Sequence, residues 1–272
     1  MRSVESTLTH PHQLLRLSFR VAAFALAPIV ACGGGSSGEV PASATPYTSK
    51  SDETVVVGDG KGGAVYATPA GAGCLQIGAE CVKPQDKCGA AARADVIVDS
   101  AGKVVEIVCY PPASNPPNVE ATGTVDLDKE NKGVIALDGV DDGLDIAGDV
   151  SSKGNNVTVY GQGTKVSVIG GSVAASGNNF SLRGVTVKGN VTIKGNNATL
   201  VLCAIDGNLT IEGNNAVVAE CVVSGRVTIT GNNSKLLSNK VQGPLQVNGT
   251  STTCDANVSF AGAALSCGDT KK

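Results

Sequence analysis

Cysteine is the residue type in this chain with the most evident chemistry, because thiol groups form disulfides, bind metals and carry lipids. The sequence has nine cysteines. Eight remain when Cys32 is assigned a separate role, and an even number in an exported chain predicts disulfides. Cys74, Cys81 and Cys88 are spaced seven residues apart, which does not match the C-x₂-C pairs of zinc sites. The eight disulfide candidates are Cys74, Cys81, Cys88, Cys109, Cys203, Cys221, Cys254 and Cys267.

These eight cysteines fall into three groups along the chain. We expect two disulfides within residues 74–109, for which three connectivities are open. Cys254 and Cys267 are expected to clamp the C-terminal end. Cys203 and Cys221 lie eighteen residues apart, and either a disulfide or a pair of buried free thiols fits that spacing.

Residues for acid–base catalysis are sparse. Both histidines, His10 and His12, precede Cys32. The chain after Cys32 therefore has no histidine for a catalytic triad or a His-ligated zinc site, and it has no phosphate loop or dinucleotide fingerprint. We predict no enzyme activity, no catalytic residue, no cofactor and no metal site.

One oxygen-rich segment has ligands that Ca²⁺ accepts. Its start, DLDKENKG, loosely resembles an EF-hand loop but lacks the distal Glu at the right place. The favoured interpretation is that outward-facing acids keep an open sheet edge soluble. The residues are Asp126, Asp128, Glu130, Asn131, Asp138, Asp141, Asp142, Asp145 and Asp149.

Most of the second half of the chain consists of a repeat of eighteen residues. Each repeat opens with Gly-Asn-Asn, and a fixed period near twenty residues is typical of a solenoid. Counted from that glycine, positions six, eleven, fifteen and seventeen are apolar and alternate with polar residues, which predicts about three short strands per coil. The openers are Gly177, Gly195, Gly213 and Gly231, and Gly249 keeps the step.

The expected fold is all-β, a single-stranded parallel β-solenoid with coils of about 18 residues. Right-handed winding is favoured because parallel crossovers are usually right-handed. Glycine and asparagine tolerate positive φ and are expected at the corners, where stacked Asn side chains can form amide ladders. Residues 136–153 fit one more coil, and residues 154–176 fit a coil five residues longer that bulges near 160–164.

The N-terminus has the features of an export signal. Arg16 and Arg20 precede a short apolar stretch, residues 21–31. The sequence IVAC at 29–32 resembles the lipobox of bacterial lipoproteins. That resemblance implies cleavage before Cys32, a lipid on its thiol and attachment to a membrane, and Gly33 after the cysteine implies the outer membrane. An ordinary signal peptide is the alternative.

Composition divides the rest of the chain. Residues 32–63 are predicted to be a flexible linker, 64–113 a small disulfide-rich module containing a hairpin, 119–250 the solenoid, and 251–272 a C-terminal cap and tail. The apolar core pattern weakens at the end of the solenoid. Position nine of the repeat, which is Cys203 and then Cys221 in two earlier repeats, becomes Asn239. After residue 31 the chain has 18 Lys and Arg against 23 Asp and Glu, and this net charge of −5 gives no reason to expect nucleic acid.

The repeated unit GNNxxVxxxxVxGxVxIxGNN resembles a bacterial repeat family known as domain of unknown function 3060. The resemblance covers about residues 136–250. It implies a β-solenoid in an exported or lipid-anchored envelope protein, and it implies no activity.

We therefore expect a non-enzymatic scaffold or binding module whose partner is an envelope protein or a glycan. A β-helix polysaccharide lyase or hydrolase is the alternative, although it needs paired carboxylates and long loops. An ice-binding face is a third interpretation. The regular Asn-x-Thr row breaks at Arg226, which argues against it. The candidate binding face consists of Asn190, Thr192, Asn208, Thr210, Arg226 and Thr228.

Overall fold

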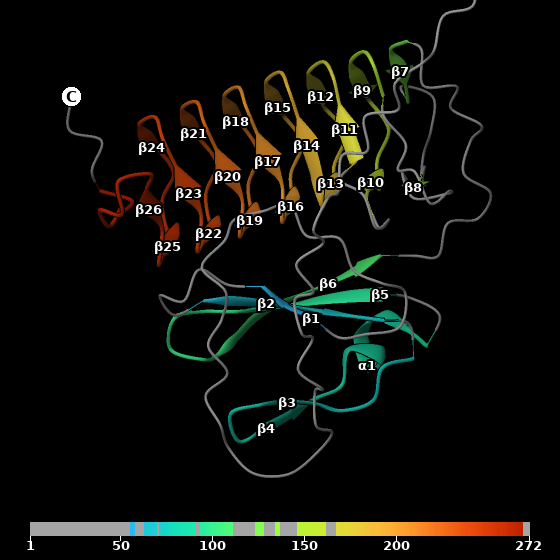
Figure 1. Cartoon of the computed structure of the whole chain (residues 1–272), viewed down its shortest axis with the longest axis vertical. Coiled ribbons are helices and arrows are strands. Elements are labelled where there is room, and N and C mark those ends of the chain that lie inside the picture. Colours follow the sequence, from blue (N-terminus) through green and yellow to red (C-terminus); the bar gives the residue numbers. More distant parts are fainter. Residues whose placement is uncertain are drawn as a thin grey trace, which may run out of the picture. The chain divides into compact units, whose positions relative to one another are not determined.

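The computed structural model describes residues 55–57, 63–69, 71–90, 93–110, 123–127, 134–136, 146–161 and 167–268. The described residues belong to one compact unit within residues 39–272, and residues 1–38 lie outside the described residues. The predicted signal segment, Cys32 and most of the linker therefore also lie outside them. The described residues form a small module followed by a parallel β-solenoid (Figure 1).

The solenoid consists of three parallel sheets, and successive coils add one short strand to each (Figure 1). We call the sheet that holds positions fifteen to seventeen the threonine sheet. Its strands, in chain order, are β7 (Val125–Asp126), β9 (Val150–Ser152), β12 (Val173–Ala175), β15 (Val191–Ile193), β18 (Leu209–Ile211), β21 (Val227–Ile229) and β24 (Leu245–Val247).

The other two sheets hold the remaining strand positions of each coil. The docking sheet contains β8 (Val134–Ala136), β10 (Thr158–Tyr160), β13 (Ser181–Arg183), β16 (Thr199–Val201), β19 (Val217–Ala219), β22 (Lys235–Leu237) and β25 (Thr253–Asp255). The third sheet contains β11 (Ser167–Ile169), β14 (Val185–Val187), β17 (Ala204–Ile205), β20 (Val222–Val223), β23 (Lys240–Val241) and β26 (Val258–Ser259).

Equivalent residues of neighbouring coils lie side by side in the core. Ile193, Ile211 and Ile229 pair in register at position seventeen, and all three are fully buried. Alternation puts every second strand residue inside, so these columns form one continuous apolar core. The predicted β-solenoid is confirmed; its right-handed winding stays a prediction.

The glycine and the asparagines of the Gly-Asn-Asn corner have separate roles. Positive φ is found at the second asparagine, with φ 59° at both Asn179 and Asn197. The glycine at position one instead allows close stacking, because a Cβ on Gly195 would overlap the carbonyl group of Gly177. Of the two residue types expected at this corner, the asparagine therefore adopts the positive φ.

The predicted amide ladders are present at this corner. Asn196 Nδ2 donates to Asn178 Oδ1 over 3.2 Å, and Asn197 Nδ2 donates to Asn179 Oδ1 over 2.9 Å. The Asn178 oxygen also accepts the backbone N–H of Asn196 at 2.9 Å. These side chains thus add to the backbone hydrogen bonds that join the bends of neighbouring coils, such as that from the Asn179 N–H to the Asn196 carbonyl over 2.8 Å.

Coil lengths differ from the sequence interpretation near the start of the solenoid. Thr158 pairs with Ser181, whereas Ser167 pairs with Val185, so the five extra residues of coil 154–176 lie between β10 and β11, as expected. However, Thr158 also pairs with Val134, twenty-four residues earlier. The coil before residue 154 is therefore longer than the predicted 136–153. Its extra residues fall between β8 and Ile146, in a part of the sequence that has no Gly-Asn-Asn motif.

The module contains a four-stranded antiparallel sheet, a two-stranded hairpin and one short helix, α1 (Pro84–Cys88). The sheet, which we call the module sheet, begins inside the predicted linker. Its order is β1 (Val55–Val57), β2 (Ala64–Thr68), β5 (Arg93–Val98) and β6 (Val104–Tyr110), and the separate hairpin is β3 (Leu75–Ile77) with β4 (Glu80–Val82). The predicted hairpin corresponds to β5 and β6.

Three disulfides are formed among the described residues, and one of the three open connectivities in the module is selected. Cys74 pairs with Cys81, and Cys88 pairs with Cys109. Cys254 pairs with Cys267, as expected. This last bond holds a C-terminal segment in which Ala264 bridges Val258 and the partly buried Leu265 packs on the core. The end of the core is thereby covered, which protects a sheet edge.

Candidate functional site

The predicted binding face is assembled on the threonine sheet. Thr192 pairs in register with Thr210, and Thr210 pairs with Thr228. The three side chains point away from the core and are half-buried. Their hydroxyl groups form no hydrogen bond with the part of the chain that is described. Parallel strands lie about 4.8 Å apart, so the row offers hydroxyl groups at that regular spacing.

The residues beside the row point hydrogen-bond donors outward. Asn190 Oδ1 accepts the backbone N–H of Asn208, and Asn208 Oδ1 accepts the backbone N–H of Arg226, both at 2.8 Å. Because the two side-chain oxygens are engaged, the exposed polar groups of Asn190 and Asn208 are their amide N–H₂ groups. Arg226 is exposed at the next place in the same column. The structure therefore brings all six predicted face residues together.

Charged side chains at the borders of this face are paired between coils. Lys194 lies 3.6 Å from Glu212, and Lys188 lies 2.9 Å from Asp206. All four side chains are at least 44% exposed. Solvent screens such pairs, so they contribute little to stability. They do neutralise the two lysines, whereas Arg226 forms no salt bridge with the described residues.

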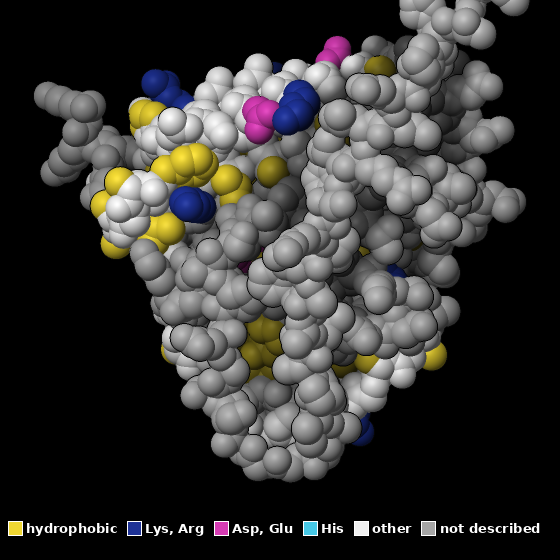
Figure 2. Space-filling view, in the orientation of Figure 1, with side chains coloured by type: hydrophobic (Ala, Val, Ile, Leu, Met, Phe, Trp, Pro, Cys, Tyr) yellow, Lys and Arg dark blue, Asp and Glu magenta, His cyan; other side chains and the backbone are white. Residues whose placement is uncertain are grey.

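The outward side of the third sheet has a different character. Its outward column at position ten includes the half-buried apolar residues Val168, Ala204 and Val222. Figure 2 shows hydrophobic side chains over the C-terminal coils, where Phe260 is 41% exposed and Lys240 Nζ lies 5.2 Å from its ring centroid. This surface has fewer hydrogen-bonding groups than the threonine sheet.

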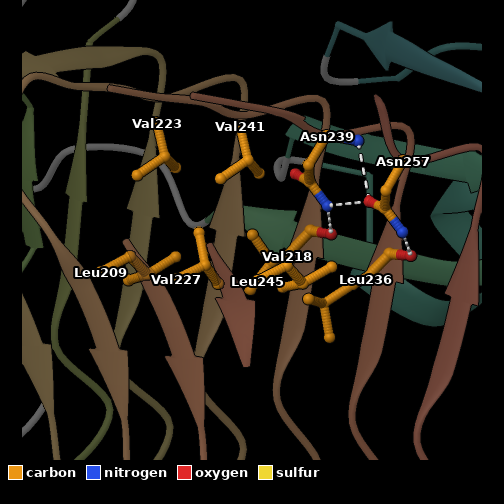
Figure 3. Close-up of a pocket in the computed structure, with 9 residues that line it drawn as sticks. All are labelled: Leu209, Val218, Val223, Val227, Leu236, Asn239, Val241, Leu245 and Asn257. Atoms are coloured by element: carbon orange, nitrogen blue, oxygen red, sulfur yellow. Dashed lines mark hydrogen bonds between the residues drawn. The ribbon is translucent and has the colours of Figure 1, made fainter. Parts of the chain in front are cut away.

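Position nine forms an interior column of hydrogen-bond donors. Cys203 Sγ lies 3.3 Å from the position-six carbonyl of Leu182. Two coils further on, Asn239 Nδ2 donates to the equivalent carbonyl of Val218 over 2.9 Å, and Asn257 Nδ2 donates to that of Leu236 over 2.8 Å (Figure 3). The polar residue that interrupts the apolar pattern at position nine, Asn239, is therefore buried and hydrogen-bonded in the same column as the cysteine.

The structure also shows the state of Cys203 and Cys221. Both thiols are free and buried, so the disulfide alternative for this pair is not formed and the alternative of two buried thiols is found. A disulfide would remove the S–H donor that faces the Leu182 carbonyl. Burial raises the pKa of the Cys221 thiol well above its ordinary value, and the neighbouring Cys203 raises it further.

Around these amides the interior is closely packed. Figure 3 shows Leu209, Val227 and Leu245 facing Val223 and Val241 across the core. The space that these residues enclose together with Asn239 and Asn257 is too small for a water molecule. It is therefore a feature of the packing and not a ligand pocket.

The remaining predicted sites lie mostly outside the described residues. Cys32 and most of the acidic segment are among these, while Asp126 and Asp149 are described. Among the described residues, no three His, Cys, Asp or Glu side chains are grouped so as to hold a metal ion. In the same part of the chain, no helix is long and apolar enough to cross a membrane.

The outward side of the docking sheet is the feature that sequence reasoning missed. Its position-seven column contains Tyr160, Arg183, Val201, Ala219 and Leu237, all buried. An outward column that is mostly apolar is the signal that could have revealed it. The module covers this column, and Val65, Ile97, Val108 and Tyr110 join Val201, Leu202 and Leu237 in one apolar cluster.

Comparisons with protein-family models, curated proteins and solved structures find no match for this chain.

Proposed function

We propose that this protein is a lipid-anchored protein of the cell envelope whose solenoid is a non-enzymatic scaffold. The lipobox-like IVAC segment, followed at once by a Gly/Ser-rich stretch, supports the anchor. The observation that carries the binding role is the row of Thr192, Thr210 and Thr228, with the donor column of Asn190, Asn208 and Arg226 beside it. We call these six residues the threonine face.

The threonine face suits a long partner with regularly spaced oxygen acceptors. Its donors are held by the coil stack, so little conformational entropy is lost when they are engaged. The face is also a nearly flat sheet surface, and solenoids commonly use such extended surfaces for binding. An envelope glycan or an extended envelope protein segment meets both requirements.

A capture experiment from envelope fractions tests this role. The bait carries Cys32→Ser, so that it is not lipidated, and is compared with a variant that also carries Thr192→Lys, Thr210→Lys and Thr228→Lys. A control adds the same charge away from this face, through the exposed residues Ala79→Lys in the module and Ala261→Lys and Ala263→Lys in the C-terminal segment. The partner should be lost from the threonine variant alone. Equal recovery with all three baits would remove the threonine face from the proposal.

The anchor is tested separately with the unmodified chain. It should partition with membranes and incorporate radiolabelled fatty acid, and Cys32→Ser should abolish both. A membrane-bound Cys32→Ser protein would contradict lipid anchoring at this residue without affecting the binding test.

A further inference from the structure

The module is fixed to the solenoid by polar contacts at three places along the docking sheet. Arg183 of β13 binds Asp95 of β5. Lys235 of β22 reaches the carbonyl of Val105 over 3.1 Å. Asp255 of β25 accepts hydrogen bonds from the backbone N–H and the hydroxyl of Ser100, both at 2.6 Å.

These contacts extend across five neighbouring strands, β13, β16, β19, β22 and β25. At strand spacing this is a span of roughly 19 Å. Apolar contacts fill the interval, since Val201, Val217 and Leu237 belong to the cluster that includes Val65 and Ile97 of the module. The module therefore contacts coils that are not neighbours of each other.

The Arg183–Asp95 pair fixes where along the solenoid the module binds. Arg183 Nε and Nη2 donate to the two Asp95 oxygens over 2.6 and 2.8 Å, and the side chains are 6% and 1% exposed. The guanidinium carbon also lies 5.2 Å from the centroid of the Tyr110 ring. A buried carboxylate without its partner is strongly destabilising.

Sliding the module by one coil would break this pairing. The neighbours of Arg183 in its column are Tyr160 on one side and Val201 on the other. Neither side chain can neutralise Asp95, and Arg183 would in turn lose its own partner. The buried pair thus selects one register of the module against many similar coils.

We propose that the module is a lateral clamp that joins the coils from β13 to β25 into one cooperative unit, with Asp95 and Arg183 setting its register. A solenoid without such a clamp has contacts only between adjacent coils, and its coils can open in separate steps. Contacts that bridge five coils couple these steps. The clamp also keeps the docking sheet closed to outside partners.

Native-state amide hydrogen exchange of the whole protein tests the clamp. Protected amides of β16 and β19 should share one opening equilibrium with those of β2 and β5. Arg183→Met leaves Asp95 buried without a counter-charge and should raise opening in both regions together, by about a hundredfold or more. Asp206→Asn, which removes the exposed Lys188–Asp206 pair, is the matched control and should change exchange by about twofold at most.

Faster exchange in the module with unchanged exchange in β16 and β19 would overturn the proposal, because the regions would then open independently. If Arg183→Met does not accumulate as folded protein, the double variant Asp95→Leu with Arg183→Met replaces the pair by apolar side chains. It should recover folding, with the two regions still opening together. A double variant as damaging as the single one would exclude charge pairing as the basis of the register.

Discussion

The threonine sheet and the docking sheet are formed by the same coils, yet their outward sides have opposite environments. Thr210 of β18 is half-exposed, whereas Ala219 of β19, in the next coil, is fully buried beneath the module. Their inward residues follow the same alternation and join the same core. The inward pattern therefore makes the solenoid, and the outward residues determine which side is covered.

The largest expected effect comes from placing the same charge on each sheet. Ala219→Lys puts an ammonium group among Val201, Leu237 and the module, and we expect it to destabilise the fold by about 3 kcal/mol or more. Thr210→Lys should change stability by no more than about 0.5 kcal/mol. Urea unfolding of the two variants measures the difference. Equal losses would contradict the contrast between the two sides.

A smaller effect is expected inside the coils, where the two sheets share one core. Asn239→Val leaves the Val218 carbonyl and the Cys221 N–H without their side-chain partner. A hydrogen bond of this kind contributes about 0.5–1.5 kcal/mol, so we expect the loss of the two to cost about 2 kcal/mol in total. The exposed Asn248 of the same coil is the control, and Asn248→Val should have little effect in the same unfolding experiment. A near-neutral Asn239→Val would show that the donor column is dispensable.

The smallest effect concerns pH and the edge of the module that faces the docking sheet. Burial opposes ionisation of Glu106, but hydrogen bonds and charges from Lys87 and Lys235 outweigh it and lower the pKa of Glu106 below its ordinary value. The stability from this ionised carboxylate is fully present above the ordinary pKa and is lost as pH falls through the lowered one.

Glu106→Gln should therefore flatten the pH dependence of stability in that acidic range. Exposed Glu80 of β4 provides the matched substitution, Glu80→Gln. Thermal unfolding at a series of pH values measures both variants. An unchanged acid slope in Glu106→Gln would mean that the two lysines do not hold this carboxylate in the folded protein.

The regular coils were predictable because their period is short and repeated. Ile193, Ile211 and Ile229 recur every eighteen residues, and a strand register that repeats in this way has one simple solution. The threonine face followed from the same period. The longer early coil was not predictable, since residues before 154 lack the Gly-Asn-Asn marker that sets the phase.

The docked module could not be predicted from local pattern. Asp95 and Arg183 are 88 residues apart and belong to regions with different periods. Neither residue carries a local signal that it will be buried, because a charged residue on an outward strand position normally faces solvent. Similarly, the spacing of Cys203 and Cys221 permits either a disulfide or two free thiols, and only the tertiary structure shows that both thiols are free and buried.

The sequence by itself thus determines the stacked coils, the asparagine ladders and the polar row of Thr192, Thr210 and Thr228, because each depends on contacts between residues one repeat apart. Only the tertiary structure decided that the module packs along the docking sheet, with Asp95 bound to Arg183. The physical reason is that burial of an outward face depends on a partner surface, and a strand pattern specifies its own core without specifying what covers its other side.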